Sequence, residues 1–189
     1  MVDPVQDLIG FIDASPTQFH AVHNAAARLS DAGFEEFARH SGDEPGARFV
    51  VRDGALVAWV DGDAPAAPLR VIGAHTDSPN LRLRPRPDLT SAGMQQLRIE
   101  VYGGALVNSW LDRDLGLAGR VALRDGAGVT EELYRSEDPL LRVPQLAIHL
   151  DRDVNERGLQ LDRQTHLTPV WGLGDSAPDD FREWLAGEL

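Results

Sequence analysis

Apolar residues near the start of the chain recur every three or four positions. This spacing places them on one face of a helix in each of two stretches. The two apolar faces are Val5, Leu8, Ile9 and Ile12 in the first stretch, and Phe19, Val22, Ala26 and Leu29 in the second. We therefore predict a helix over residues 4–13 and another over residues 16–32. Ser15-Pro16 separates them, and Gly33 ends the second.

The pattern changes from helical to extended after residue 47. The segments FVVRDG and ALVAWVDG read as two strands joined by Asp53-Gly54, a dipeptide typical of hairpin turns. Residues 69–74 then form a short, nearly continuous apolar run, as in strands buried inside an α/β sheet. Helices followed by such strands predict an α/β or α+β layer fold.

The second half of the chain has mainly the sequence patterns of β-strands. Residues 97–102 alternate between apolar and polar, as a half-exposed strand does. Further strand candidates are residues 117–124, 132–134 and 146–150, and helical spacing returns only at residues 179–188. We expect a β-rich module that is distinct from the first half and starts at about residue 95.

Composition and charge exclude several classes of protein. The 189 residues carry a net charge of -12, which disfavours a nucleic-acid partner. No run of 18 apolar residues occurs, so no membrane-spanning helix is expected, and the acidic start does not resemble a secretory signal. The net acidity favours a soluble, cytoplasmic protein. Cysteine is absent, so any metal must be held by His, Asp or Glu.

The segment richest in chemical groups follows the apolar run, at residues 73–79 (GAHTDSP). His75 and Asp77 are two positions apart, so in an extended chain their side chains point to the same side. An imidazole can bind a divalent metal through one nitrogen while a carboxylate orients the ring. The competing interpretation is a His that simply pairs with Asp77 in a turn. A serine triad with Ser78 is disfavoured, because such close neighbours cannot line up in series.

Six stretches, in this order, resemble the N-terminal part of the aspartyl aminopeptidase family of zinc metallopeptidases. They are Ser15-Pro16 with Phe19-His20-Ala21; residues 73–79; Tyr102-Gly103-Gly104; residues 110–115 with 117–120; residues 144–150; and Asn155-Glu156 with His166-Leu167. The resemblance covers the chain from about residue 8 to about residue 173, and six ordered stretches at family-like spacing make it specific.

The resemblance implies an activity, a site and an architecture. The family uses two zinc ions and a metal-activated water to release N-terminal Asp or Glu from peptides. The resemblance implies that His75 is a metal ligand and that Asp77 orients it. It further implies that His149 contacts substrate in a neighbouring subunit. It also implies a homo-oligomer. Residues 1–93 would be the N-terminal part of the α/β catalytic domain, and residues 94–189 the first part of a β-rich inserted dimerisation domain.

The chain also departs from the family. We find none of the motifs that carry the other metal ligands, since the surroundings of Glu35-Glu36 and Glu131-Glu132 do not match. One His cannot hold a zinc pair, so we expect the chain to be inactive alone. One alternative is a non-catalytic oligomerisation or regulatory module that binds a full-length partner. Another is a related metallopeptidase with a different specificity. We also expect the chain to form an oligomer or to have a poorly ordered C-terminal third.

Three other groups could carry chemistry. Residues 151–162 resemble a calcium loop, but Glu156 occupies the position that needs Gly, which favours a solvated turn. His20 and His23 could form a metal pair on a helix, although a capping or exposed role is favoured. Asp112 and Asp114 could be an acid–base pair, but the family's pattern favours structural ion pairs.

Overall fold

The computed structural model describes residues 3–38, 45–62, 68–174, 178 and 180–189, and divides the chain into two compact units. The first unit is Met1–Ser78 with Ala118–Val121, and the second is Pro79–Leu117 with Ala122–Leu189. Both contain helix and strand, which gives the mixed content predicted from the sequence. None of the described helices has the length and apolarity needed to cross a membrane.

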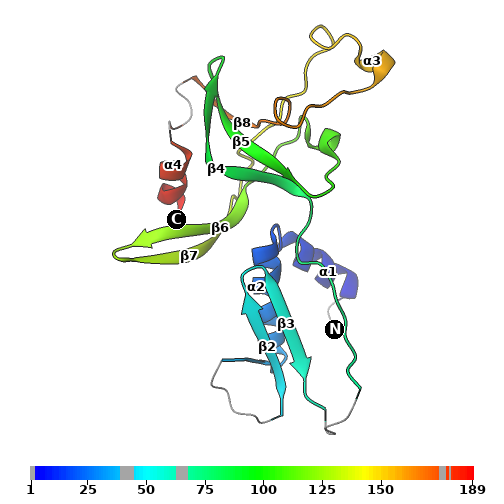
Figure 1. The fold of residues 1–189 in the computed structure, drawn as a ribbon, viewed down its shortest axis with the longest axis vertical. Helices are drawn as coiled ribbons and strands as arrows, with labels where there is room; N and C mark the ends of the chain where they lie inside the picture. Colours follow the sequence, from blue (N-terminus) through cyan, green and yellow to red (C-terminus); the bar gives the residue numbers. More distant parts are fainter. Residues whose placement is uncertain (1–2, 39–44, 63–67, 175–177, 179) are drawn as a thin grey trace. The chain divides into compact units, whose positions relative to one another are not determined.

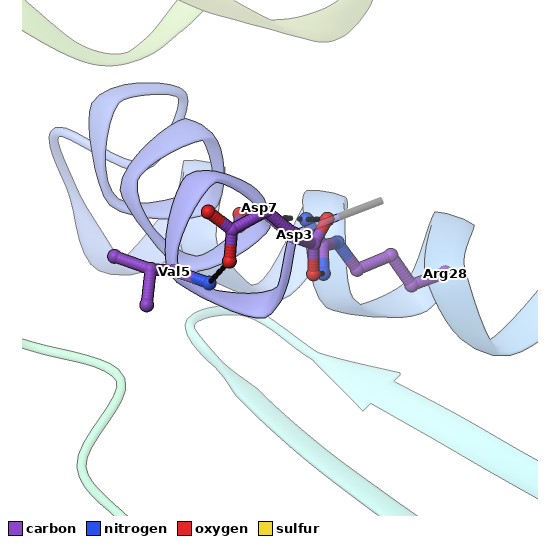
Figure 2. A network of polar contacts seen from close by, with 4 residues as sticks. All are labelled: Asp3, Val5, Asp7 and Arg28. Atoms are coloured by element: carbon purple, nitrogen blue, oxygen red, sulfur yellow. Dashed lines mark hydrogen bonds and ion pairs between the residues drawn. The ribbon is translucent and has the colours of Figure 1, made fainter. Parts of the chain in front are cut away.

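The two stretches with helical spacing of apolar residues fold as the predicted helices, α1 (Pro4–Asp13) and α2 (Gln18–Asp31). Asp3 caps α1, since its carboxylate accepts the Val5 N–H at 3.0 Å (Figure 2). Arg28 of α2 donates to both carboxylate oxygens of Asp7, at 2.7 and 2.9 Å (Figure 2). Both side chains are about half exposed, so this pair contributes at most about 1 kcal/mol.

The first unit also contains a three-stranded sheet of β1 (Glu35–Glu36), β2 (Ala47–Arg52) and β3 (Ala55–Val60), in that order. β1 is parallel to β2, and β2 pairs antiparallel with β3, which confirms the predicted hairpin. The hairpin runs beside α2 in Figure 1. Among the described residues of this unit, the buried ones are Val22 of α2 at 2% exposed, Phe49 of β2 at 3% and His20 of α2 at 9%.

The predicted strand over residues 69–74 is wrong for this structure. These residues have no strand partner in the described part of the chain, and Leu69, Val71 and Ile72 are 91%, 86% and 96% exposed. An extended segment becomes a strand only when neighbouring backbone groups pair with its N–H and C=O groups. The apolar side chains of residues 69–74 favour burial, but no described part of the chain covers them.

The second unit is built on an antiparallel sheet of β4 (Asn80–Ser91), β5 (Met94–Tyr102) and β8 (Val170–Leu173), in that order. The predicted strand over residues 97–102 is confirmed as part of β5, whereas β4 and β8 were not predicted. The core beside this sheet also includes residues near the 3-10 helix η1 (Val107–Trp110). Its buried members are Ile99, Leu111, Val143 and Leu167.

A two-stranded sheet and two helices complete the chain. The strands are β6 (Ala118–Asp125) and β7 (Gly128–Arg135), which confirm the predicted strands near 117–124 and 132–134 (Figure 1). The helices are α3 (Val154–Arg157) and α4 (Phe181–Glu188), and the second of these corresponds to the predicted helix over 179–188.

The predicted strand over residues 146–150 is wrong. The Leu150 N–H donates to the Ala147 carbonyl at 2.8 Å, which closes a turn in place of a strand ladder. Alternating apolar residues give the same sequence signal in a strand and in an exposed turn of this kind, so the pattern alone did not separate them.

Candidate metal-binding segment

His75 and Asp77 pair with one another in the first unit. The ring nitrogen Nδ1 of His75 lies 3.1 Å from Oδ1 of Asp77. The His75 side chain is 93% exposed and that of Asp77 is 31% exposed. A carboxylate on Nδ1 favours the tautomer with the proton there, which leaves the Nε2 lone pair to bind a cation. Within the described residues, Nε2 has no hydrogen-bond partner, so the ring is oriented but remains available.

Thr76 fastens this segment to the β2–β3 hairpin. Its hydroxyl donates to the Gly54 carbonyl oxygen at 2.7 Å. Gly54 in turn lies so close to α2 that a Cβ at this position would be 2.7 Å from Cγ of Gln18. The residue between the two candidate site residues is thus held by a turn that itself packs on a helix. We did not identify Thr76 or Gly54 as site-supporting residues from the sequence, because only the tertiary structure brings them together.

The turn that holds Thr76 is stabilised from its other side. Asp53 takes a positive φ of 51°, which Asp tolerates better than most residues. Its carboxylate accepts a hydrogen bond from Arg120 at 2.9 Å. The Arg120 guanidinium also lies 4.4 Å from the centre of the Phe19 ring. These contacts within the first unit link the hairpin turn to the start of α2.

The donor set that the described residues offer a metal is incomplete. No cluster of three or more His, Cys, Asp or Glu side chains that could hold a metal ion occurs among them. His75 with Asp77 fits one oriented ligand of a zinc site, but a stable site needs several ligands in a defined geometry. The His75–Asp77 pair can therefore supply one ligand of a metal centre, but it does not form a metal centre by itself.

The helical pair His20 and His23 does not form a metal site in the structure. Nδ1 of His20 lies 2.8 Å from the hydroxyl of Thr17, and His20 is only 9% exposed. Thr17 also accepts the His20 N–H and is the N-cap of α2. His23 is exposed. The alternative of a capping or exposed role therefore fits better than a metal pair: His20 lies at the helix cap and His23 is exposed.

His149 lies in the exposed turn at residues 148–150 of the second unit. The segment that carries it begins at Gln145, whose N–H donates to Oδ1 of Asp112 at 3.1 Å. Asp114 pairs with Arg142, so the expected structural ion pair is confirmed for this acid. Asp112 and Asp114 therefore contact Gln145 and Arg142, which precede His149 in the chain.

The candidate calcium loop is a turn organised by one carboxylate. Oδ1 of Asp162 accepts hydrogen bonds from the Gln164 N–H, the Thr165 N–H and the Thr165 hydroxyl, at 2.9, 2.9 and 3.0 Å. These bonds, the one from the Thr165 N–H foremost, lower the pKa of Asp162. Nδ1 of His166 accepts the Asp162 N–H at 2.9 Å. This arrangement supports the solvated-turn interpretation.

Comparison with known proteins identifies relatives over most of the chain. The family described as aminopeptidase I zinc metalloprotease (M18) matches residues 11–183. A probable M18 family aminopeptidase 2 from Streptomyces coelicolor is 57% identical over 177 residues, which are 92% of this chain and 40% of that protein. A chain in the cryo-EM structure of the Ape4 and Nbr1 complex is 37% identical, with a TM-score of 0.84. That match covers 90% of this chain and 34% of the other.

A further solved relative is an oligomer. The S. cerevisiae mApe1 dodecamer is 25% identical, with a TM-score of 0.67, over 92% of this chain and 49% of that chain. This chain spans about two fifths of the length of the curated relatives it matches. The resemblance inferred from residues 8–173 is confirmed by a family match of nearly the same extent, and the chain belongs to the aminopeptidase I zinc metalloprotease family, M18.

Proposed function

We propose that the complete protein is a zinc-dependent aminopeptidase that releases N-terminal Asp or Glu from peptides and works in the cytoplasm. The observation that carries this proposal is the His75–Asp77 contact, in which one ring nitrogen is held and the other is available. The family match over residues 11–183 supports the peptidase chemistry. The preference for acidic residues rests on the resemblance to aspartyl aminopeptidases.

In this proposal His75 is one zinc ligand, and Asp77 is the residue that orients it. When bound, two zinc ions would lower the pKa of a water and polarise the scissile carbonyl. Asp77 keeps the Nδ1 proton of His75 in place, so Nε2 faces outward with its lone pair. Thr76 limits the movement of both residues through its bond to Gly54. The remaining ligands come from other parts of the complete protein.

His149 is proposed to contact the substrate in the site of a neighbouring subunit. Its exposed position in a turn suits a residue that reaches beyond its own unit. Homo-oligomer formation is supported by the dodecamer of the related mApe1. Residues 94–189 would supply part of the surface through which subunits associate.

The chain of 189 residues is proposed to be inactive by itself. Its described residues supply no group of three metal-binding side chains, so a zinc pair would lack most of its ligands. This same observation favours the alternative of a non-catalytic module that binds a full-length partner. The two alternatives differ in whether the reading frame carries the missing ligand motifs after Leu189.

The test uses the protein expressed from its complete reading frame. Zinc is removed with a chelator and restored, and hydrolysis of Asp-, Glu- and Leu-anilides is measured. We expect zinc-dependent turnover that favours Asp and Glu. Asp77→Asn is expected to lower activity or zinc affinity about 10- to 100-fold, and His75→Ala by at least as much. His23→Ala is the matched control, because it removes an exposed His of the same unit.

Each outcome of this experiment is informative. Zinc-dependent turnover that prefers Leu would retain the peptidase and overturn the acidic specificity. Full activity in His75→Ala would overturn the metal-ligand role. Robust turnover by residues 1–189 alone would contradict the incomplete site. A reading frame without further ligand motifs, together with binding to a full-length family member, would favour the non-catalytic module.

A further inference from the structure

Asp112 has an unusual backbone conformation next to the core of the second unit. Its φ is 51°, in the left-handed region that few residues other than Gly adopt. The preceding residue, Leu111, forms an isolated parallel bridge with Val143, and these two residues are 8% and 0% exposed. The chain therefore turns sharply at Asp112, directly after the buried contact between Leu111 and Val143.

This turn lets Asp112 hold the chain on both sides of Pro144. Its backbone N–H donates to the Val143 carbonyl at 2.9 Å. Its Oδ1 accepts the N–H of Gln145 at 3.1 Å. Asp112 thus binds Val143, just before Pro144, through its main chain. It binds Gln145, just after Pro144, through its side chain.

The segment that follows has few other constraints. Residues 144–150 are all exposed, and their turn is closed internally by the hydrogen bond from Leu150 to Ala147. The Asp151 N–H also donates to the Ala147 carbonyl, at 3.2 Å. Among the described residues, the bond from Gln145 to Asp112 is the one hydrogen bond between residues 145–150 and a part of the chain distant in sequence. The direction in which this segment leaves the core therefore depends on Asp112.

We propose that Asp112 is a positioning residue for His149, and this inference rests on the substrate contact proposed above for His149. A side chain that must reach a site in another subunit binds best when its segment is already directed there, because less conformational freedom is lost on binding. Asp112 provides this direction from the buried Leu111–Val143 contact. It does not touch substrate itself.

Two substitutions separate the carboxylate from the backbone turn. Asp112→Gly removes the acceptor and keeps a residue that adopts the left-handed conformation without strain. Asp112→Asn keeps an oxygen acceptor and also tolerates this conformation. If Asp112 acts as proposed, the Gly variant loses function and the Asn variant retains it. Both variants are made in the complete, assembled protein, and its oligomer size is checked.

Two measurements then follow. Hydrogen exchange of the peptide over residues 144–150 is expected to be about threefold to tenfold faster in Asp112→Gly and nearly unchanged in Asp112→Asn. The KM for an Asp-anilide is expected to rise by a similar factor in Asp112→Gly, with a smaller change in kcat. In a His149→Ala background, Asp112→Gly is expected to change KM no further, because the residue it positions is gone.

The outcomes distinguish this inference from the function on which it rests. An unchanged KM in His149→Ala would show that the proposed substrate contact is wrong. A raised KM in His149→Ala together with an unchanged KM in Asp112→Gly would overturn the positioning role alone. Additive effects in the double variant would also overturn it. Loss of the oligomer in Asp112→Gly but not in Asp112→Asn would instead assign the carboxylate a role in assembly.

Discussion

Substituting Gly54 with Ala tests whether the hairpin turn that holds Thr76 is packed on α2. A Cβ at this position would lie 2.7 Å from Cγ of Gln18, and 3.2 and 3.3 Å from its Nε2 and Cδ. Cγ is near the backbone, so a change at the far end of the side chain alone does not relieve the closest contact. Gln18 is the first residue of α2, where the helix cap limits backbone movement.

The expected cost follows from two opposing effects. Overpacking of this kind costs about 1–3 kcal/mol. Ala also stabilises by about 0.4–1 kcal/mol, because it restricts the unfolded chain more than Gly does. Gly54 does not have a φ between +20° and +160°, so an Ala there adds no left-handed strain. We therefore expect Gly54→Ala to destabilise the first unit by about 0.5–2 kcal/mol.

The assay is hydrogen exchange of the β2 and β3 amides, with urea unfolding as a second measure. The matched control is the double variant Gly54→Ala/Gln18→Ala, in which the side-chain atoms that clash are removed. We expect a coupling free energy of about 1–3 kcal/mol between the two positions, in the sense that the double variant recovers stability.

Two results would refute the reasoning. A Gly54→Ala variant as stable as the original chain would show that the turn does not pack tightly on α2. A destabilised variant that Gln18→Ala fails to rescue would place the cost elsewhere. Either result would also weaken the argument that the turn limits movement of Thr76 and, with it, of His75 and Asp77.

Two further predictions concern the second unit. Phe181→Ala removes a ring that is 4% exposed and lies 5.5 and 5.7 Å from two tryptophan rings, so a loss of about 3–5 kcal/mol is expected. It should appear as fast hydrogen exchange of α4, and Arg182→Ala, at an exposed position, should leave that exchange unchanged. Hydrogen bonds from the Thr165 N–H and its neighbours lower the pKa of Asp162, so their stabilisation is complete above the ordinary Asp pKa of about 3.9. It should be lost as the pH falls through the lower folded pKa. The pH dependence of the Thr165 amide shift measures this, and Asp162→Asn, which cannot titrate, should abolish the transition; a transition that persisted would assign it to another group.

Local sequence patterns predicted the elements that depend on near neighbours. The helices at residues 4–13 and 16–32, and the hairpin around Asp53-Gly54, form because their caps, apolar spacing and turn residues lie within the same short segment. The pattern failed at residues 69–74 and 146–150. An apolar stretch indicates that burial is favourable, but it does not indicate whether another strand lies beside it to pair with.

The candidate site was predicted in part. The sequence indicated that His75 and Asp77 can face the same side, and their side chains are 3.1 Å apart in the structure. It gave no sign that Thr76 is fastened to Gly54, 22 positions away, or that Asp112 holds Gln145, 33 positions away. Such contacts depend on where the folded chain brings two distant backbones together.

For this protein the sequence alone determined the family, the first helices and hairpin, and the pair of side chains with metal-binding chemistry. These properties reside in residue identity and in short-range spacing, which exist before the chain folds. The tertiary structure decided which segments are paired or exposed, and which residues hold the site segments in place. Those properties depend on contacts between residues far apart in the chain, since no local pattern specifies the partner of an unpaired strand or of a surface carboxylate.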